Sequence, residues 1–98
     1  MEIMLNNEGA ALTVALTGRL DTRTAPELEH ALEENLPGKT DVTFDLAGLE
    51  YISSAGLRVF LKAQKNMNRQ GSMRLIHVCP AVMEIFDMTG FTDLLTIE

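Results

Sequence analysis

The sequence predicts an α/β fold with one small mixed sheet of about five strands, three helices and the order β-β-α-β-α-β-α-β. Two observations carry this prediction. Short segments in which apolar and polar residues alternate, as in strands, take turns with longer segments whose apolar residues recur every three or four positions, as in amphipathic helices. Glycine or proline separates most of these segments from the next. Strands that alternate with helices favour right-handed crossovers, so pairing after the first hairpin should be mostly parallel.

The first half of the chain predicts a hairpin followed by a helix. Residues 2–6 and 11–16 alternate like strands, and the turn between them contains Gly9. Residues 24–27 have the spacing of a capping box, and Pro26 suits the first turn of a helix. This helix should stop at the next proline-glycine pair.

The middle of the chain predicts a third strand and a second helix. Residues 42–46 alternate, and residues 47–50 are expected to connect this strand to the helix. The apolar residues that indicate the helix are Leu57, Phe60, Leu61 and Met67. A turn at Gly71 then leads into a strand at residues 73–78.

The end of the chain predicts a third helix and a short last strand. Pro80 should begin the helix, Gly90 is placed to end it, and residues 94–97 should form the strand. Every expected strand alternates, whereas parallel strands buried on both faces are apolar throughout. We therefore expect the helices to cover one face of the sheet well and the other poorly.

Two serines, Ser53 and Ser54, lie between the expected third strand and the expected second helix. Hydroxyls at a helix N-terminus lie beside unpaired backbone N–H groups, where negative charge is tolerated. Ser54 could therefore carry a phosphate without unfolding the helix, which makes it a candidate switch. The alternative is that Ser53 or Ser54 only caps the helix, a role that stabilises by about 1 kcal/mol. The two roles are compatible.

A second loop should lie beside these serines. Ligand and modification sites in open α/β sheets gather at the carboxyl ends of the strands, and the loop containing Asp21 and Thr22 leaves such an end. Asp21 could cap a helix, hold the Ser54 hydroxyl or contact a partner. An ordinary role as a loop or cap residue is favoured over a direct functional role.

Composition limits the classes of function. The formal net charge of −6 argues against binding to nucleic acid or to an acidic membrane surface. No apolar run approaches the roughly 20 residues that cross a bilayer, and the first residues lack a secretory signal, so a cytoplasmic location is expected. Basic residues do recur along the second helix, either as a stripe for an acidic partner or as an ordinary solvated face: Arg58, Lys62, Lys65 and Arg69.

Catalysis is not expected. A serine nucleophile needs a base within hydrogen-bond reach, and neither His30 nor His77 is near the start of the second helix by spacing. The sequence contains no Gly-x-Ser-x-Gly elbow, Walker loop or Gly-x-Gly-x-x-Gly motif. A single cysteine, Cys79, excludes an internal disulfide and a thiolate metal cluster; it should be a small buried hydrophobe or, less simply, a reactive thiol.

Residues 45–59 resemble the signature stretch of the STAS domains, most closely that of the anti-sigma factor antagonists of bacteria. Residues 16–21 resemble the second strand of that family and its following loop, and residues 80–91 resemble its third helix and glycine stop. The order and spacing match along nearly the whole chain. The resemblance therefore implies a single STAS-type domain over residues 1–98.

The resemblance also implies a function. In that family the phosphorylated serine stands two residues before the glycine, which is Ser54 here, while Ser53 replaces a frequent aspartate and is an alternative acceptor. The unmodified protein would bind an anti-sigma factor that is also an ATP-dependent serine kinase, and a metal-dependent serine phosphatase would reverse the modification. ATP and metal belong to the partners, so this chain needs no cofactor. The expected docking residues are Asp21, Thr22, Ser53, Ser54, Gly56, Leu57 and Arg58.

Two further expectations follow from the resemblance. Some STAS domains are accessory subunits of membrane transporters, including lipid transport systems, where they dock on an ATPase and regulate it. This is the alternative function. Many relatives also continue into another helix after the last strand, and here we expect that helix to be short or absent because the sequence stops at Glu98.

Overall fold

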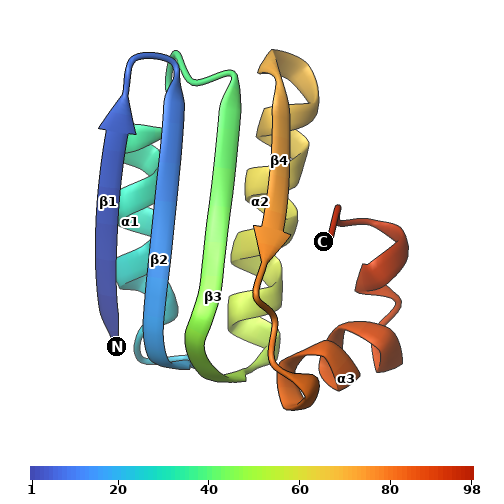
Figure 1. Ribbon diagram of the computed structural model, residues 1–98. Helices are drawn as coiled ribbons and strands as arrows, with labels where there is room; N and C mark the ends of the chain where they lie inside the picture. Colours follow the sequence, from blue (N-terminus) through green and yellow to red (C-terminus); the bar gives the residue numbers. More distant parts are fainter.

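The computed structural model describes all 98 residues. Its centre is a four-stranded sheet (Figure 1). The strands lie side by side in sequence order: β1 (Glu2–Glu8), β2 (Ala11–Leu20), β3 (Asp41–Ile52) and β4 (Ser72–Ile76). β1 pairs antiparallel with β2, and the two remaining pairings are parallel. The α/β class, the order of the first seven elements and the mixed pairing are therefore confirmed.

The strand count is four, not about five. After the short 3-10 helix η1 (Phe91–Asp93), only one isolated parallel bridge forms, between Ile97 and Leu75. It rests on two hydrogen bonds, in which Leu75 N–H donates to Thr96 O and Glu98 N–H donates to Leu75 O, both at 2.9 Å. The expected strand at residues 94–97 is therefore reduced to a single bridge at the edge of β4.

β3 is longer than its sequence pattern suggests. The residues expected as a connection, 47–50, belong to the strand, which runs on to Ile52. The register between β2 and β3 shifts between Ala15 and Thr17 and again between Gly18 and Arg19. Such irregularities break the period of two, and the buried residues of this stretch recur every three positions instead: Leu46, Leu49 and Ile52.

Three helices complete the fold: α1 (Ala25–Asn35), α2 (Ser54–Gln70) and α3 (Pro80–Met88). α1 and α2 lie next to each other behind the sheet in Figure 1, and α3 lies beyond the carboxyl end of β4. The opposite face of the sheet is largely open, as expected; Met4 on that face is 66% exposed. No helix is both long and apolar enough to cross a membrane.

One continuous core joins the sheet to the helices. Phe60 of α2 makes edge-to-face contacts with Phe44 of β3 and Phe86 of α3, with ring centroids 5.1 and 6.2 Å apart. All three rings are fully buried. These contacts fix α2 against β3, and so fix the place where β3 ends and α2 begins.

Candidate functional site

The carboxyl ends of β2 and β3 lie side by side and carry both candidate loops. Ser53 N–H, just after β3, donates a hydrogen bond to Leu20 O at the end of β2. A surface hollow beside them is lined by Thr22 from the first loop and by Ala55 and Arg58 from α2. The expectation that the two loops are neighbours is confirmed.

The two serines have different surroundings. Ser54 is the first residue of α2 and is exposed. Ser53 precedes the helix in an extended conformation, with φ −101° and ψ 176°, and its Oγ is buried without a hydrogen-bond partner. The Ser53 side chain makes no cap hydrogen bond. The simple cap interpretation therefore fails for the Ser53 hydroxyl, and only the Ser54 hydroxyl faces solvent.

The backbone around Ser54 is suited to negative charge. The first intrahelical bond of α2 runs from Leu57 N–H to Ser53 O at 3.0 Å, so the N–H groups of Ser54, Ala55 and Gly56 have no carbonyl partner. The first turn contains no acidic residue. Arg58 is exposed one turn further along. Free N–H groups, the positive end of the helix dipole and a guanidinium all favour an anion here.

Gly56 and Leu57, two of the expected docking residues, are buried. A Cβ at Gly56 would lie 2.6 Å from Leu20 Cγ and 2.9 Å from Ile52 Cγ1, so only glycine lets α2 start this close to the strand ends. Leu57 is 6% exposed and belongs to the core. Both residues hold the Ser54 turn against the sheet from beneath.

Asp21 organises its own loop. Its Oδ1 accepts hydrogen bonds from the N–H groups of Arg23 and Thr24 at 3.0 and 3.1 Å, and its own N–H donates to Thr24 Oγ1 at 2.9 Å. Partial desolvation works to raise the pKa of Asp21, but these hydrogen bonds and the nearby Arg19 outweigh it and lower the pKa. Asp21 therefore stabilises its own loop, and it makes no hydrogen bond to Ser54.

The sequence analysis missed a cation–π pair at the ends of β2 and β3. The guanidinium carbon of Arg19 lies 4.2 Å from the centroid of the Tyr51 ring, a cation–π geometry. The two residues are partners in the register of β2 and β3. Each stands one residue before the buried end of its strand, Leu20 or Ile52. The sequence could reveal this pair only if β2 were known to extend to Leu20 and β3 to Ile52.

The remaining candidates lie apart from Ser54. His77 Nδ1 is 3.0 Å from Asp45 Oδ1, and this bond, helped by the N–H of Ala47, lowers the pKa of Asp45. His30 pairs with Glu34 at 2.7 Å on the exposed side of α1. No group of three or more His, Cys, Asp or Glu side chains is placed to hold a metal. Cys79 is half-buried, and its Sγ donates to Leu49 O at 3.4 Å.

Residues 3–96 match the family model described as Mlab, STAS domain. The anti-sigma-B factor antagonist of Staphylococcus epidermidis is 34% identical over 87 residues, which cover 87% of this chain and 81% of that protein. This match therefore spans most of both proteins.

Solved structures show the same fold. An anti-sigma factor antagonist from Mycobacterium paratuberculosis superposes with a TM-score of 0.88 at 20% identity, covering 98% of this chain and 83% of that one. The phosphorylated form of the Bacillus cell fate determinant SpoIIAA superposes with a TM-score of 0.77 at 15% identity, covering 99% and 91%. At these identities the likeness concerns the fold alone.

Proposed function

This chain belongs to the STAS domain family, and we propose that it is an anti-sigma factor antagonist controlled by a phosphate on Ser54. The unmodified protein binds an anti-sigma factor, which frees the sigma factor for transcription. That anti-sigma factor is also a serine kinase with an ATP site, and its phosphorylation of Ser54 ends the complex. A metal-dependent serine phosphatase restores the unmodified form. The cycle takes place in the cytoplasm.

One observation carries this proposal: the Ser54 hydroxyl is exposed at an open helix N-terminus beside the loop from β2. A kinase can reach this hydroxyl without unfolding any element. Relatives that match most of the chain carry the antagonist name, which supports the same function. Within this scheme the protein supplies an acceptor and a docking face rather than a catalytic site.

The effect of a phosphate at Ser54 on the free energy of binding is large enough for a switch. It adds about −1.5 to −2 charges at pH 7. In the free protein, the N–H groups at the start of α2 and the exposed Arg58 offset part of this charge. Inside a docked interface the phosphate loses water, and a poorly paired buried ion costs several kcal/mol. Moving a complex from almost all bound to almost all free requires about 5.5 kcal/mol, which is of the same order as this cost.

The docking surface surrounds Ser54. Thr22, Ser54 and Arg58 are exposed and form its outer part. Asp21 and Ser53, both half-buried, hold the two loops in place, and the buried Gly56 and Leu57 support them from below. We expect substitutions of the exposed group to weaken docking directly, and substitutions of the buried group to act through stability.

Phosphorylation with the anti-sigma factor kinase of the same genome tests the proposal. The purified chain, the kinase and ATP should yield one added phosphate by mass spectrometry. Ser54→Ala should abolish it, and the neighbouring Ser53→Ala should retain it. A phosphate that persists in Ser54→Ala would place the switch at another residue.

Binding of the same kinase to two Ser54 variants provides the second half of the test. Ser54→Asp should bind far more weakly than Ser54→Ala, because only the aspartate adds charge at the interface. Equal affinities would contradict the switch. Recovery of a transporter ATPase instead of the kinase as the stable complex would favour the alternative, a regulatory subunit of a lipid transport system.

A further inference from the structure

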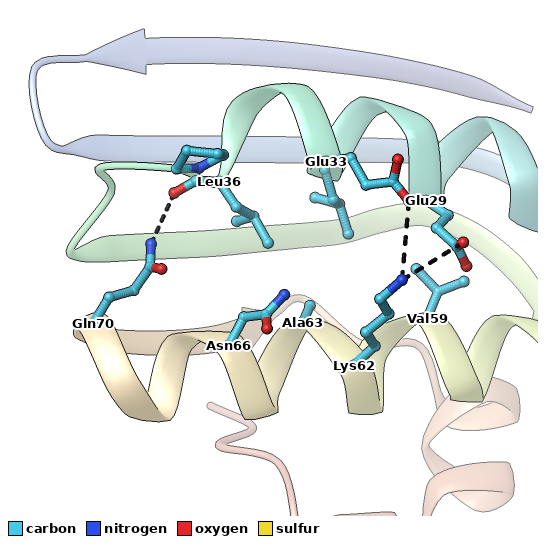
Figure 2. Close-up of a pocket in the computed structure, with 10 residues that line it drawn as sticks. Glu29, Glu33, Leu36, Val59, Lys62, Ala63, Asn66 and Gln70 are labelled. Atoms are coloured by element: carbon cyan, nitrogen blue, oxygen red, sulfur yellow. Dashed lines mark hydrogen bonds and ion pairs between the residues drawn. The ribbon is translucent and has the colours of Figure 1, made fainter.

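A groove lies between α1 and α2, and one end of it is next to Ser54. Figure 2 shows its main part, a hollow of about 330 Å³. A second hollow of similar volume shares Glu29, Val59 and Lys62 with the first and continues to Thr22 and Ala55, the residue after Ser54. Apolar side chains line the main part: Leu32, Leu36, Val59 and Ala63, together with Pro37.

The two walls of the groove carry opposite charges. Glu29 and Glu33 stand on the α1 side, and Lys62 reaches toward both from α2, with Nζ···O distances of 3.8 and 3.9 Å (Figure 2). These are long, exposed ion pairs, which contribute little to stability and are easily exchanged. One lysine also leaves two carboxylates only half neutralised. Arg58, at the end near Ser54, makes no ion pair.

We propose that this groove receives an amphipathic helix of the anti-sigma factor, with an apolar ridge on the groove floor, basic residues toward Glu29 and Glu33 and an acidic residue toward Arg58. This inference rests on the proposed function, because it assigns the docking mode of the same partner. A helix seated there ends beside Ser54, so a phosphate on Ser54 acts directly on the bound segment.

The groove walls favour a helix over an extended peptide. Both walls are helices, whose backbone N–H and C=O groups are already bonded within each helix, so no strand edge is offered for main-chain pairing. From Ala55 to Gln70 the groove follows α2 for about 22 Å, the length of a helix of about 15 residues. An inserted helix satisfies its own backbone and presents only side chains.

The charges also distinguish a different protein from a second copy of this chain. The inserted helix needs both signs of charge, basic on one side and acidic on the other. α1 and α3 contain no Lys or Arg, and α2 contains no Asp or Glu. No helix of this chain therefore has the required pattern, whereas a partner of other sequence can provide it.

A pair of adjacent glutamates gives a matched test. Glu33 lines the groove, while Glu34 is exposed on α1, pairs with His30 and does not line the groove. Calorimetric titration with the anti-sigma factor kinase should show Glu33→Lys binding about tenfold more weakly than wild type. Glu34→Lys, with the same change in net charge, should stay within about twofold. Equal effects of the two variants would overturn the groove assignment.

A steric pair tests the groove independently of charge. Asn66 lines the groove, and Asn68 lies two residues further along, about 200° around the helix, where it accepts a hydrogen bond from Gln64. Asn66→Trp should fill the groove and weaken kinase binding by about tenfold or more, while Asn68→Trp should bind like wild type. Circular dichroism melting confirms that both variants fold.

The outcomes separate this inference from the proposed function. If wild type binds the kinase and is phosphorylated at Ser54, but Glu33→Lys and Asn66→Trp bind equally well, the groove assignment alone is wrong. If wild type does not bind the kinase, both the groove assignment and the proposed function are wrong. A wild-type dimer in sedimentation that Asn66→Trp disrupts would show that a second copy occupies the groove, which contradicts a partner helix.

Discussion

Ser53 and Ser54 are neighbours in sequence, but the fold gives them different chemistry. The Ser54 hydroxyl is exposed on the first turn of α2, whereas Ser53 Oγ is buried and has no hydrogen-bond partner. Modification of Ser53 would require the turn to open, and modification of Ser54 does not. Nearby, Asp21 makes hydrogen bonds within its own loop, and Arg19 of β2 contacts the Tyr51 ring of the neighbouring strand β3.

At the residue scale, Ser53→Ala should be neutral or stabilising. A buried hydroxyl without a partner carries a desolvation cost of about 1–3 kcal/mol, and its removal recovers part of that cost. No cap is lost, since the Ser53 side chain makes no cap hydrogen bond. Urea denaturation should give a free energy of unfolding between wild type and about 1 kcal/mol above it. A loss of about 1 kcal/mol would instead reveal a cap.

At the element scale, the junction of β3 and α2 is the decisive structure. β3 extends to Ile52 and α2 begins at Ser54, so a single residue separates the central strand from the helix. The connection is this short because Gly56 allows the first turn of α2 to lie directly on Leu20 and Ile52. The exposure of Ser54 is thus a consequence of how α2 packs on the strand ends.

Gly56→Ala should therefore destabilise the protein. The new Cβ would meet Leu20 Cγ at 2.6 Å and Ile52 Cγ1 at 2.9 Å, and forced repacking of this kind costs about 1–3 kcal/mol. Ser54→Ala is the control in the same turn, and its effect should stay within about 0.5 kcal/mol because the side chain is exposed. Thermal or urea unfolding measures both. Equal stabilities of the two variants would mean that the turn moves freely away from the sheet.

The elements also show what sequence reasoning could and could not provide. Regular periods predicted the three helices and about five strands, of which four form. The parallel strand order then predicted that the loops at Thr22 and Ser54 are neighbours. Irregular stretches of the strands could not be predicted from the hydrophobic pattern. The register shifts of β2 and β3 concealed the second half of β3 and with it the Arg19–Tyr51 pair. Non-local hydrogen bonds leave Ile97 with one bridge rather than a strand, and no local pattern signals that.

At the scale of the whole molecule, the helices cover one face of the sheet and bring the groove and Ser54 to the same side of the fold. The chain is acidic overall, with a net charge of −6, yet α2 contains only basic charges. Long-range attraction between charged surfaces speeds encounter and orients partners. The charge distribution thus favours a docking partner that presents acidic groups to α2 and basic groups to α1.

The stability of the whole molecule should depend on two carboxylates in acid. The pKa values of Asp21 and Asp45 are both lowered by hydrogen bonds that their charged forms accept. A lowered folded-state pKa adds stability above the unfolded value of about 3.9, and that stability is lost as pH falls through the folded value. Asp21→Asn/Asp45→Asn should be less stable than wild type at pH 7, and the difference should shrink below about pH 4.

Urea denaturation at a series of pH values measures this dependence. Asp41→Asn is the control, because Asp41 is exposed and its carboxylate accepts no side-chain or backbone hydrogen bond. It should follow wild type throughout. A gap between the double variant and wild type that stays constant from pH 7 to pH 3 would show that these carboxylates do not stabilise the fold through their charge.

The central claim is that a phosphate on Ser54 Oγ ends the complex with the anti-sigma factor. Its most direct measurement is calorimetric titration of that factor with fully phosphorylated protein and, in parallel, with unmodified protein. The phosphorylated form should bind about ten-thousandfold more weakly, a change of about 5.5 kcal/mol. Dissociation constants within about threefold of each other would contradict the account.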